Sequence, residues 1–227
     1  MSAPTKTRTT WIWFVVGLVV VGAIGALSTG FALGWGQPRL PSPSSSAEPS
    51  PSSSSSPADI SITGCLGGAA RDAEMVLSAV DQAPHTTNGA VEVASAFVRW
   101  LNQFPYPSAD DSRAVQGAAL ASGAPTKDIV AFFESEPNLS GGLVPDQTPY
   151  NLSTVGGVFH VESTGTDAAT ITIGTSLVED GALSPSLKGS ITVTLAWEND
   201  GWMFVSSEGT RTTEDLFAIG EPFSEGC

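Results

Sequence analysis

An uncharged apolar run near the N-terminus constrains this chain more than any other feature. Residues 11–33 contain no charged side chain. As an α-helix this run is roughly 35 Å long, enough to cross a hydrocarbon core of about 30 Å. Trp11 and Trp13 at one end and Trp35 at the other lie where interfacial aromatic residues are expected. The sequence therefore predicts one transmembrane helix over residues 11–35.

The flanking charges predict how this helix is oriented. Lys6 and Arg8 precede the run, and the nearest charge after it is Arg39. This bias predicts that residues 1–10 are cytosolic and that the rest of the chain lies outside a cell membrane, crossed once. A cleaved signal peptide is the alternative, but its apolar core would span only about 7–15 residues. The length of the run favours a retained anchor.

Two glycines give the apolar run a possible packing face. Gly30 and Gly34 form a GxxxG pattern, which allows two membrane helices to approach closely. The alternative is that glycine is simply common in membrane helices. Self-association through Gly30 and Gly34 therefore remains one of two interpretations.

A proline- and serine-rich linker follows over residues 36–58. Residues 37–58 contain ten serines and six prolines. Such a segment has too little apolar surface to form a core, so we expect it to be disordered and extended. Its expected role is a spacer between the membrane and an extracytoplasmic domain over residues 59–227.

The part of the chain beyond the apolar run is strongly acidic. It carries 7 basic and 23 acidic residues, a net charge of −16. Because lysine and arginine provide most affinity for phosphates, this charge argues against a nucleic-acid partner. The expected partners are the membrane and other envelope proteins, including copies of this chain.

The two cysteines lie at opposite ends of the expected domain. An even cysteine count outside the cytosol indicates a disulfide, here between Cys65 and Cys227. Two independent thiols are the alternative. The chain lacks CxxC spacing and has only two histidines, so we expect no metal site and no cofactor.

The pattern of apolar residues changes from helical to strand-like along the domain. Three- and four-residue steps predict helices over residues 66–81, 90–104, 113–121 and 125–134, with Asp111 capping the third. Alternation then predicts strands over 157–163, 169–178, 189–198 and 202–207, the last two joined by a turn at Asp200-Gly201. Helices followed by an antiparallel meander define an α+β fold.

Two stretches carry a resemblance to a known fold. Residues 89–101 read GAVEVASAFVRWL, and residues 194–202 read TLAWENDGW. They resemble the long first helix and the last hairpin of the nuclear-transport-factor-two-like, or cystatin-like, cone. The resemblance implies N-terminal helices packed on a curved antiparallel sheet.

With one transmembrane helix in front, the layout is similar to the bitopic scaffold subunits of bacterial type IV secretion and conjugation machines. This chain lacks the second copy of the domain that some relatives have. It also carries a linker that the family does not require.

The sequence offers little that points to catalysis. His85 falls in an expected loop, and His160 falls on the strand face opposite Phe159. The acidic pairs at residues 110–111 and 179–180 fall at expected turns, and GxSxG, HExxH and P-loop patterns are absent. We therefore expect a non-enzymatic scaffold or assembly subunit of the envelope, possibly of a conjugation or type IV secretion apparatus. The alternative is an anchored ligand-binding protein, or an isomerase-like enzyme, that uses the interior of the cone. That alternative requires a sizeable pocket there.

Overall fold

The computed structural model describes residues 59–227. The predicted cytosolic N-terminus, transmembrane helix, Gly30–Gly34 face and linker lie outside the described residues. Within residues 59–227, no helix has the length and apolar character needed to cross a membrane.

Five helices form in the described part of the chain. They are α1 (Ala73–Gln82), α2 (Thr87–Leu101), α3 (Ala109–Ala119), α4 (Ile129–Ser135) and α5 (Thr213–Ile219). Each begins after a side chain that accepts a hydrogen bond from a backbone N–H in its first turn, which satisfies a donor the helix itself leaves free. These N-cap residues are Asp72, Thr86, Ser108, Asp128 and Thr212. The expectation that Asp111 caps the third helix was wrong by one turn. Asp111 instead donates its N–H to Ser108 and accepts from the Ser108 hydroxyl.

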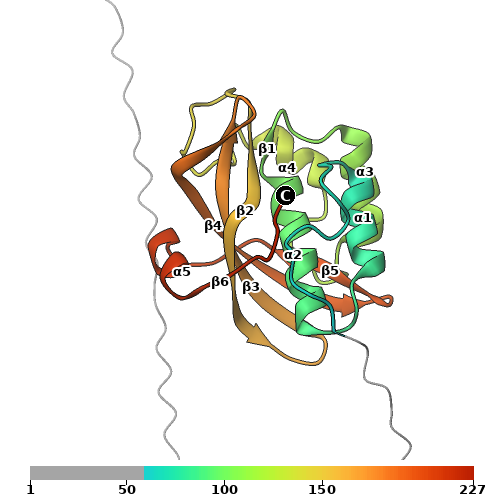
Figure 1. Cartoon of the computed structure of the whole chain (residues 1–227). Helices are drawn as coiled ribbons and strands as arrows, with labels where there is room; N and C mark the ends of the chain where they lie inside the picture. The colour runs from blue at the N-terminus through green and yellow to red at the C-terminus, as the bar shows by residue number, and fades with distance from the viewer. Residues whose placement is uncertain (1–58) are drawn as a thin grey trace, which may run out of the picture. The chain divides into compact units, whose positions relative to one another are not determined.

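One antiparallel sheet forms the other layer. Its strands are β1 (Gln103–Phe104), β2 (Tyr150–Thr164), β3 (Ala168–Glu179), β4 (Ala182–Glu198), β5 (Gly201–Ser206) and β6 (Glu221–Pro222). The order is β1-β2-β3-β4-β5, and β6 pairs with β2. Register shifts interrupt β2–β3, β3–β4 and β4–β5 pairing. Such irregularities increase bending and twist, consistent with the curved sheet in Figure 1.

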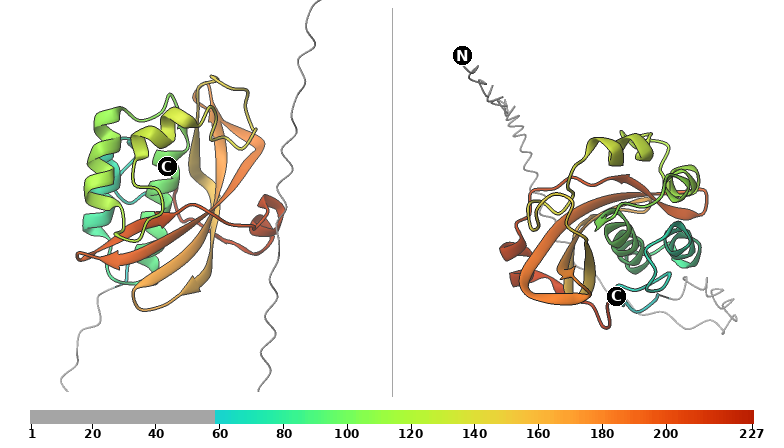
Figure 2. Two further views of the ribbon diagram at one scale, coloured as in Figure 1. Left: turned by 180° about the vertical axis from the view of Figure 1, so that it is seen from behind. Right: turned by 90° about the horizontal axis from the view of Figure 1, so that it is seen from above.

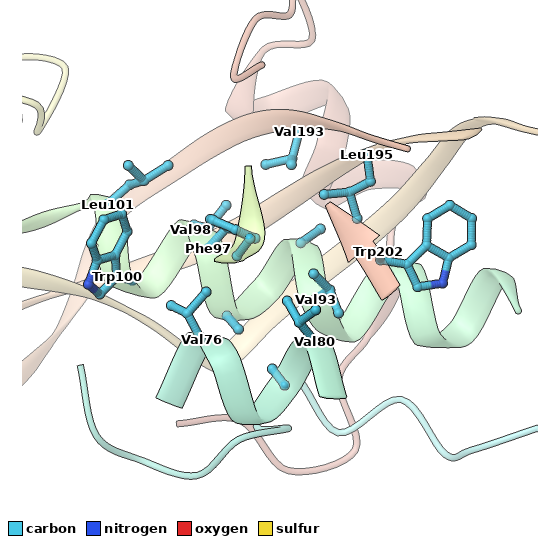
Figure 3. Close-up of a cluster of buried hydrophobic side chains, with 14 of the residues drawn as sticks. Val76, Val80, Val93, Phe97, Val98, Trp100, Leu101, Val193, Leu195 and Trp202 are labelled. Atoms are coloured by element: carbon cyan, nitrogen blue, oxygen red, sulfur yellow. The ribbon is translucent and has the colours of Figure 1, made fainter. Parts of the chain in front are cut away.

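Helices α1 to α4 lie together on one face of the sheet, and α5 lies on the other (Figures 1 and 2). Helix α2 packs directly on β2 to β5, and its residues Ala90 to Leu101 are all buried. Figure 3 shows Phe97 and Val93 on α2 close to Val193 and Leu195 on β4. Both β4 side chains are fully buried. The predicted α+β class, with N-terminal helices on a curved antiparallel sheet, is therefore confirmed for the described residues.

Two tight turns fix the register of the last strands. Asn199 and Asp200 join β4 to β5 and both have positive φ, at 52° and 62°. Asp180 and Gly181 join β3 to β4 in the same way, at 50° and 76°. Positive φ at both central positions is the type I′ geometry, whose twist matches that of paired strands. The hairpin expected at Asp200-Gly201 is present, with its turn one residue earlier.

Candidate ligand-binding cavity

A cavity of about 390 Å³ lies between the helices and one end of the sheet. The C-terminal part of α2, the chain before α4, α4 itself, β4 and β5 each contribute to its walls. The segment after β5, residues 207–211, completes the outer wall. This volume falls at the lower end of the range for small-molecule sites. The space that the ligand-binding alternative requires is therefore present.

The inner wall of this cavity is aromatic and aliphatic. The aromatic side chains come from α2, α4 and β5: Phe97, Trp100, Phe132 and Phe204. Phe97 and Phe204 contact one another with ring centroids 4.9 Å apart. The α2 residues reach the same wall because positions three and four apart share a helix face. Buried apolar walls of this kind favour a ligand with an apolar body.

The wall holds buried residues with polar side-chain atoms, among them Asn102 and Trp100. Asn102 follows α2 as its C-cap, lines the cavity and is 7% exposed. Its Nδ2 donates to Val98 O at 2.9 Å, and its backbone oxygen accepts from Leu152 N. Within residues 59–227 no donor reaches its side-chain oxygen. Among the lining residues, the buried side-chain atom without a hydrogen-bond partner in the described part of the chain is Trp100 Nε1, a donor. A buried donor without a partner costs free energy, so a ligand that accepts there gains affinity.

The outer wall is fastened across the sheet by an ion pair. Arg211 lines the cavity and binds the Glu162 carboxylate on β2 through both Nε and Nη2. Thr172 on β3 donates to the same carboxylate at 2.6 Å. These hydrogen bonds, chiefly those from Arg211, lower the pKa of Glu162 to about 2. The same contact raises the pKa of Arg211. Glu162 therefore balances the charge of this guanidinium and occupies its Nε and Nη2 edge.

Two further contacts hold the segment beside β4. Ser190 donates its hydroxyl to Arg211 O at 3.0 Å. Gly209 passes so close to Thr192 that a Cβ at this position would overlap the threonine side chain. The close approach explains why glycine is needed there.

Two further charged side chains lie at or near the cavity, Glu208 and Lys127. Glu208 lines the mouth and is exposed, and it makes no hydrogen bond or ion pair within the described residues. Lys127, next to the lining residue Thr126, donates to Ala121 O and to Ser122 O at 2.5 Å. Neither charge is balanced by an ion pair within the described residues.

The two histidines lie away from this cavity. His85 stacks on Trp197 with centroids 4.0 Å apart, and its Nε2 lies 2.8 Å from Thr166 O. His160 is half-buried on β2, opposite Thr172 of β3. Neither histidine is among the lining residues. Among residues 59–227, no three His, Cys, Asp or Glu side chains are placed to hold a metal ion.

The two cysteines come together beside β2, which Cys227 contacts at Ser153 and Thr154. Cys65 and Cys227 have Cα atoms 5.3 Å apart and are joined as a disulfide, as the predicted bond requires. Thr154 on β2 binds both ends of the chain, since its hydroxyl donates to Gly64 O and accepts from Cys227 N. The entry to the domain and its C-terminus are thereby held at one point.

A buried pair of charges on α2 escaped the sequence analysis. Glu92 is 1% exposed, and its carboxylate accepts from Thr63 N, Thr63 Oγ1, Gly64 N and Leu66 N. Arg99, two turns later, is fully buried and donates to Gly68 O and Leu66 O. Burial, and then the charge of nearby Arg71, lowers the pKa of Arg99 to about 10. The sequence did carry a signal for this feature, because two charged residues lie within an otherwise apolar helix. Charged residues at such positions are buried only where partners satisfy them.

Comparison of the chain with protein-family models found no matching family, and comparisons with curated proteins and with solved structures found no match. The similarity to type IV secretion scaffolds and to the nuclear-transport-factor-two-like cone therefore rests on the sequence pattern alone.

Proposed function

We propose that this chain is a single-pass membrane-anchored protein whose extracytoplasmic domain binds a small ligand in the interior of its curved sheet. The cavity of about 390 Å³ carries the proposal, because it combines apolar walls with a few polar groups. A buried indole N–H of the wall, Trp100 Nε1, has no partner in the described residues and supports it further. Binding without catalysis fits this site best, because its one positive side chain, Arg211, is neutralised by Glu162 outside the cavity.

Methyl NMR on the full chain in lipid nanodiscs tests this proposal. Ile129 and Ile191 line the cavity, whereas Ile219 is 52% exposed on α5, across the sheet. Among fragments of one or two rings, we expect some to shift the first two methyl signals and leave the third unchanged. Replacing Leu120, a half-buried lining residue, with tryptophan fills the space and should remove those shifts. A library that shifts neither cavity signal contradicts the proposal.

A second candidate is a non-enzymatic scaffold of the envelope, such as one in a conjugation or type IV secretion apparatus. The observation that favours it is the fastening of the domain's two ends. Residues 63–66 are held by Glu92, and Cys65 is bonded to Cys227. A domain tied at its point of entry can bear load from neighbouring subunits. In-membrane crosslinking should then recover apparatus proteins, and deletion of the gene should lower transfer. Recovery of the bait alone, with unchanged transfer, counts against this role.

A further inference from the structure

We infer that the cavity selects an uncharged, largely apolar molecule with a carbonyl oxygen, such as a ketone or an ester, and binds that oxygen through the indole N–H of Trp100. This inference rests on the proposed ligand-binding function and names the chemical class of the ligand. Three features of the walls carry it: an unpaired buried donor, charges that balance one another, and apolar surroundings.

The buried polar atom that the cavity wall leaves unpaired is a donor. Trp100 on the last turn of α2 is 0% exposed and lines the cavity, and its Nε1 has no hydrogen-bond partner within residues 59–227. The other unpaired buried side-chain atoms in this part of the chain belong to residues that do not line the cavity: Arg99, Tyr150 and Thr175. An indole nitrogen donates and does not accept, so the occupant must supply an acceptor.

The charges around the cavity balance and therefore select neither a cation nor an anion. Glu162 neutralises Arg211, and Lys127 and Glu208 carry opposite signs. A guanidinium has five N–H groups, and Glu162 binds through Nε and Nη2, so Arg211 Nη1 keeps donors without partners among the described residues. These donors suit a second acceptor of the ligand, such as the other oxygen of an ester. The acidity of the whole domain repels anions as they approach.

The apolar surroundings disfavour a charged group inside the cavity. Side chains without polar atoms form much of the wall: Ile129, Phe132, Ile191 and Phe204. A charge that leaves water for such surroundings loses hydration, and this loss is large unless opposite charge and hydrogen bonds replace it. A carbonyl oxygen loses far less hydration, and one hydrogen bond from Trp100 offsets the loss.

Three probes with the same cyclohexylethyl body test the inference: 4-cyclohexylbutan-2-one, 3-cyclohexylpropylamine and 3-cyclohexylpropionate. Each is titrated into the isoleucine-methyl-labelled full chain in nanodiscs, with free probe measured to correct for partition into lipid. Shifts at Ile129 and Ile191 report binding, and the buried core residues Ile171 and Ile173 report that each variant is folded. We expect a dissociation constant on the order of millimolar for the ketone, and affinities at least about threefold weaker for both charged probes.

The indole signals of the same ¹⁵N-labelled chain show which atom the ketone reaches. An N–H that gains a hydrogen bond moves downfield, and a cyclohexyl body adds no ring-current shift of its own. We expect the ketone to move the Trp100 Nε1–H signal in this direction. Trp202 is the matched control, because it is also buried but its Nε1 already donates to Pro84 O at 3.1 Å and it does not line the cavity. Its signal should stay in place.

Removal of the donor gives an independent measure. Trp100→Phe should weaken ketone binding about threefold to tenfold, as the loss of one hydrogen bond predicts, and should change amine binding by less than about twofold. Where this variant fails to fold, as Ile171 and Ile173 report, the indole signal of the wild type decides the question alone.

Failure of the inference differs from failure of the proposed function. The inference is wrong if the amine or the carboxylate binds as tightly as the ketone, or if the bound ketone moves the Trp100 signal no further than that of Trp202. It is also wrong if a folded Trp100→Phe variant binds the ketone as tightly as the wild type. Each of these results leaves a cavity that binds ligands of another class.

The proposed function itself fails on different results. If the three probes leave Ile129 and Ile191 unshifted up to about 10 mM while other fragments shift them, the inference alone is wrong. If no fragment shifts these two signals, or if shifts persist in both Leu120→Trp and Thr126→Trp, the cavity does not bind ligands.

Discussion

The buried carboxylate of Glu92 provides the sharpest test of how this domain is held together. Glu92 Oε1 accepts from Thr63 N, from Thr63 Oγ1 at 2.8 Å and from Gly64 N at 3.0 Å. Its Oε2 accepts from Leu66 N at 3.1 Å. Four donors from one segment therefore converge on one side chain of α2. We predict that Glu92→Gln, which keeps the shape and removes the charge, strongly destabilises the domain.

The magnitude follows from the geometry. A glutamine can keep its oxygen at the Oε1 position, but its NH₂ group then faces the N–H of Leu66. One hydrogen bond to a charged group is lost, and a buried donor is left unsatisfied. The first loss costs about 1.5–3 kcal/mol and the second about 1–3 kcal/mol. Removal of the charge also withdraws a favourable interaction from Arg99. Part of this cost is recovered because the variant no longer buries a carboxylate, so we expect a net loss of about 3 kcal/mol.

Urea unfolding of residues 52–227 measures this loss, because this segment forms a compact unit of its own. A loss of about 3 kcal/mol in a domain of this size corresponds to a fall in Tm of roughly 6–12 °C. Glu134→Gln is the matched control. Glu134 is exposed on α4, and its replacement makes the same change in net charge without removing a hydrogen bond. The control should change the free energy of unfolding by less than about 0.5 kcal/mol.

Hydrogen exchange locates the effect. The amides of Thr63, Gly64 and Leu66 should exchange much faster in Glu92→Gln than in the wild type, because these donors bind the carboxylate. If Glu92→Gln unfolds within about 0.5 kcal/mol of the wild type, and these amides remain protected, then the carboxylate does not hold the segment and our reasoning is refuted.

Three further predictions concern other contacts of the domain. Replacing both Cys65 and Cys227 with serine removes a disulfide that spans 162 residues, and it should lower the free energy of unfolding by up to about 5 kcal/mol. Equal urea midpoints for this variant and the wild type would contradict the prediction. The pKa of Glu162 is lowered from 4.5 to about 2, so its stabilisation is complete above about pH 4.5 and is lost as the pH falls toward 2. Arg211→Gln should therefore flatten the fall in stability between these pH values, and an unchanged acid transition would rule this out. His85→Ala removes a stacked contact with Trp197 and an edge contact with Trp202, and it should lower the free energy of unfolding by about 1.5 kcal/mol. Thermal unfolding measures this loss, and an unchanged Tm would show that these contacts do not stabilise the domain.

The elements with a strong periodic pattern were predictable from the sequence. The apolar stripe of α2 and the alternation of Ile171 and Ile173 on β3 gave the right element types, because burial on one face imposes these periods. The first helix was expected from residue 66 but begins at Ala73. The preceding residues cannot be helical because Gly67 and Gly68 adopt φ of 83° and 98°. Tertiary hydrogen bonds to Glu92 and Arg99 determine this conformation, and no local pattern reveals them.

The outer face of the sheet was the main omission. Alternating apolar and polar residues predict strands with one buried face, yet on the polar face Thr172 is fully buried and Thr192 is 8% exposed. The cover there comes from residues 207–211 and from α5, which the sequence analysis did not predict. A signal was present, because Thr212 and Asp215 form reciprocal hydrogen bonds of the capping-box kind. Seven residues of helix are too short for periodicity to show, so only the capping pattern could have located α5.

The cavity could not have been predicted from any single stretch of sequence. Phe97, Ile129 and Phe204 each fit the pattern of an ordinary core residue, and each does contribute to the core on one side. The space between them exists because the chain after β5 turns away to bind Glu162, instead of continuing as a strand beside β4. A long-range ion pair thus determines where the helices fail to meet the sheet. The same contact balances the charge of Arg211 in the cavity wall. The shape of the site and the balanced charge of its arginine therefore have one physical cause.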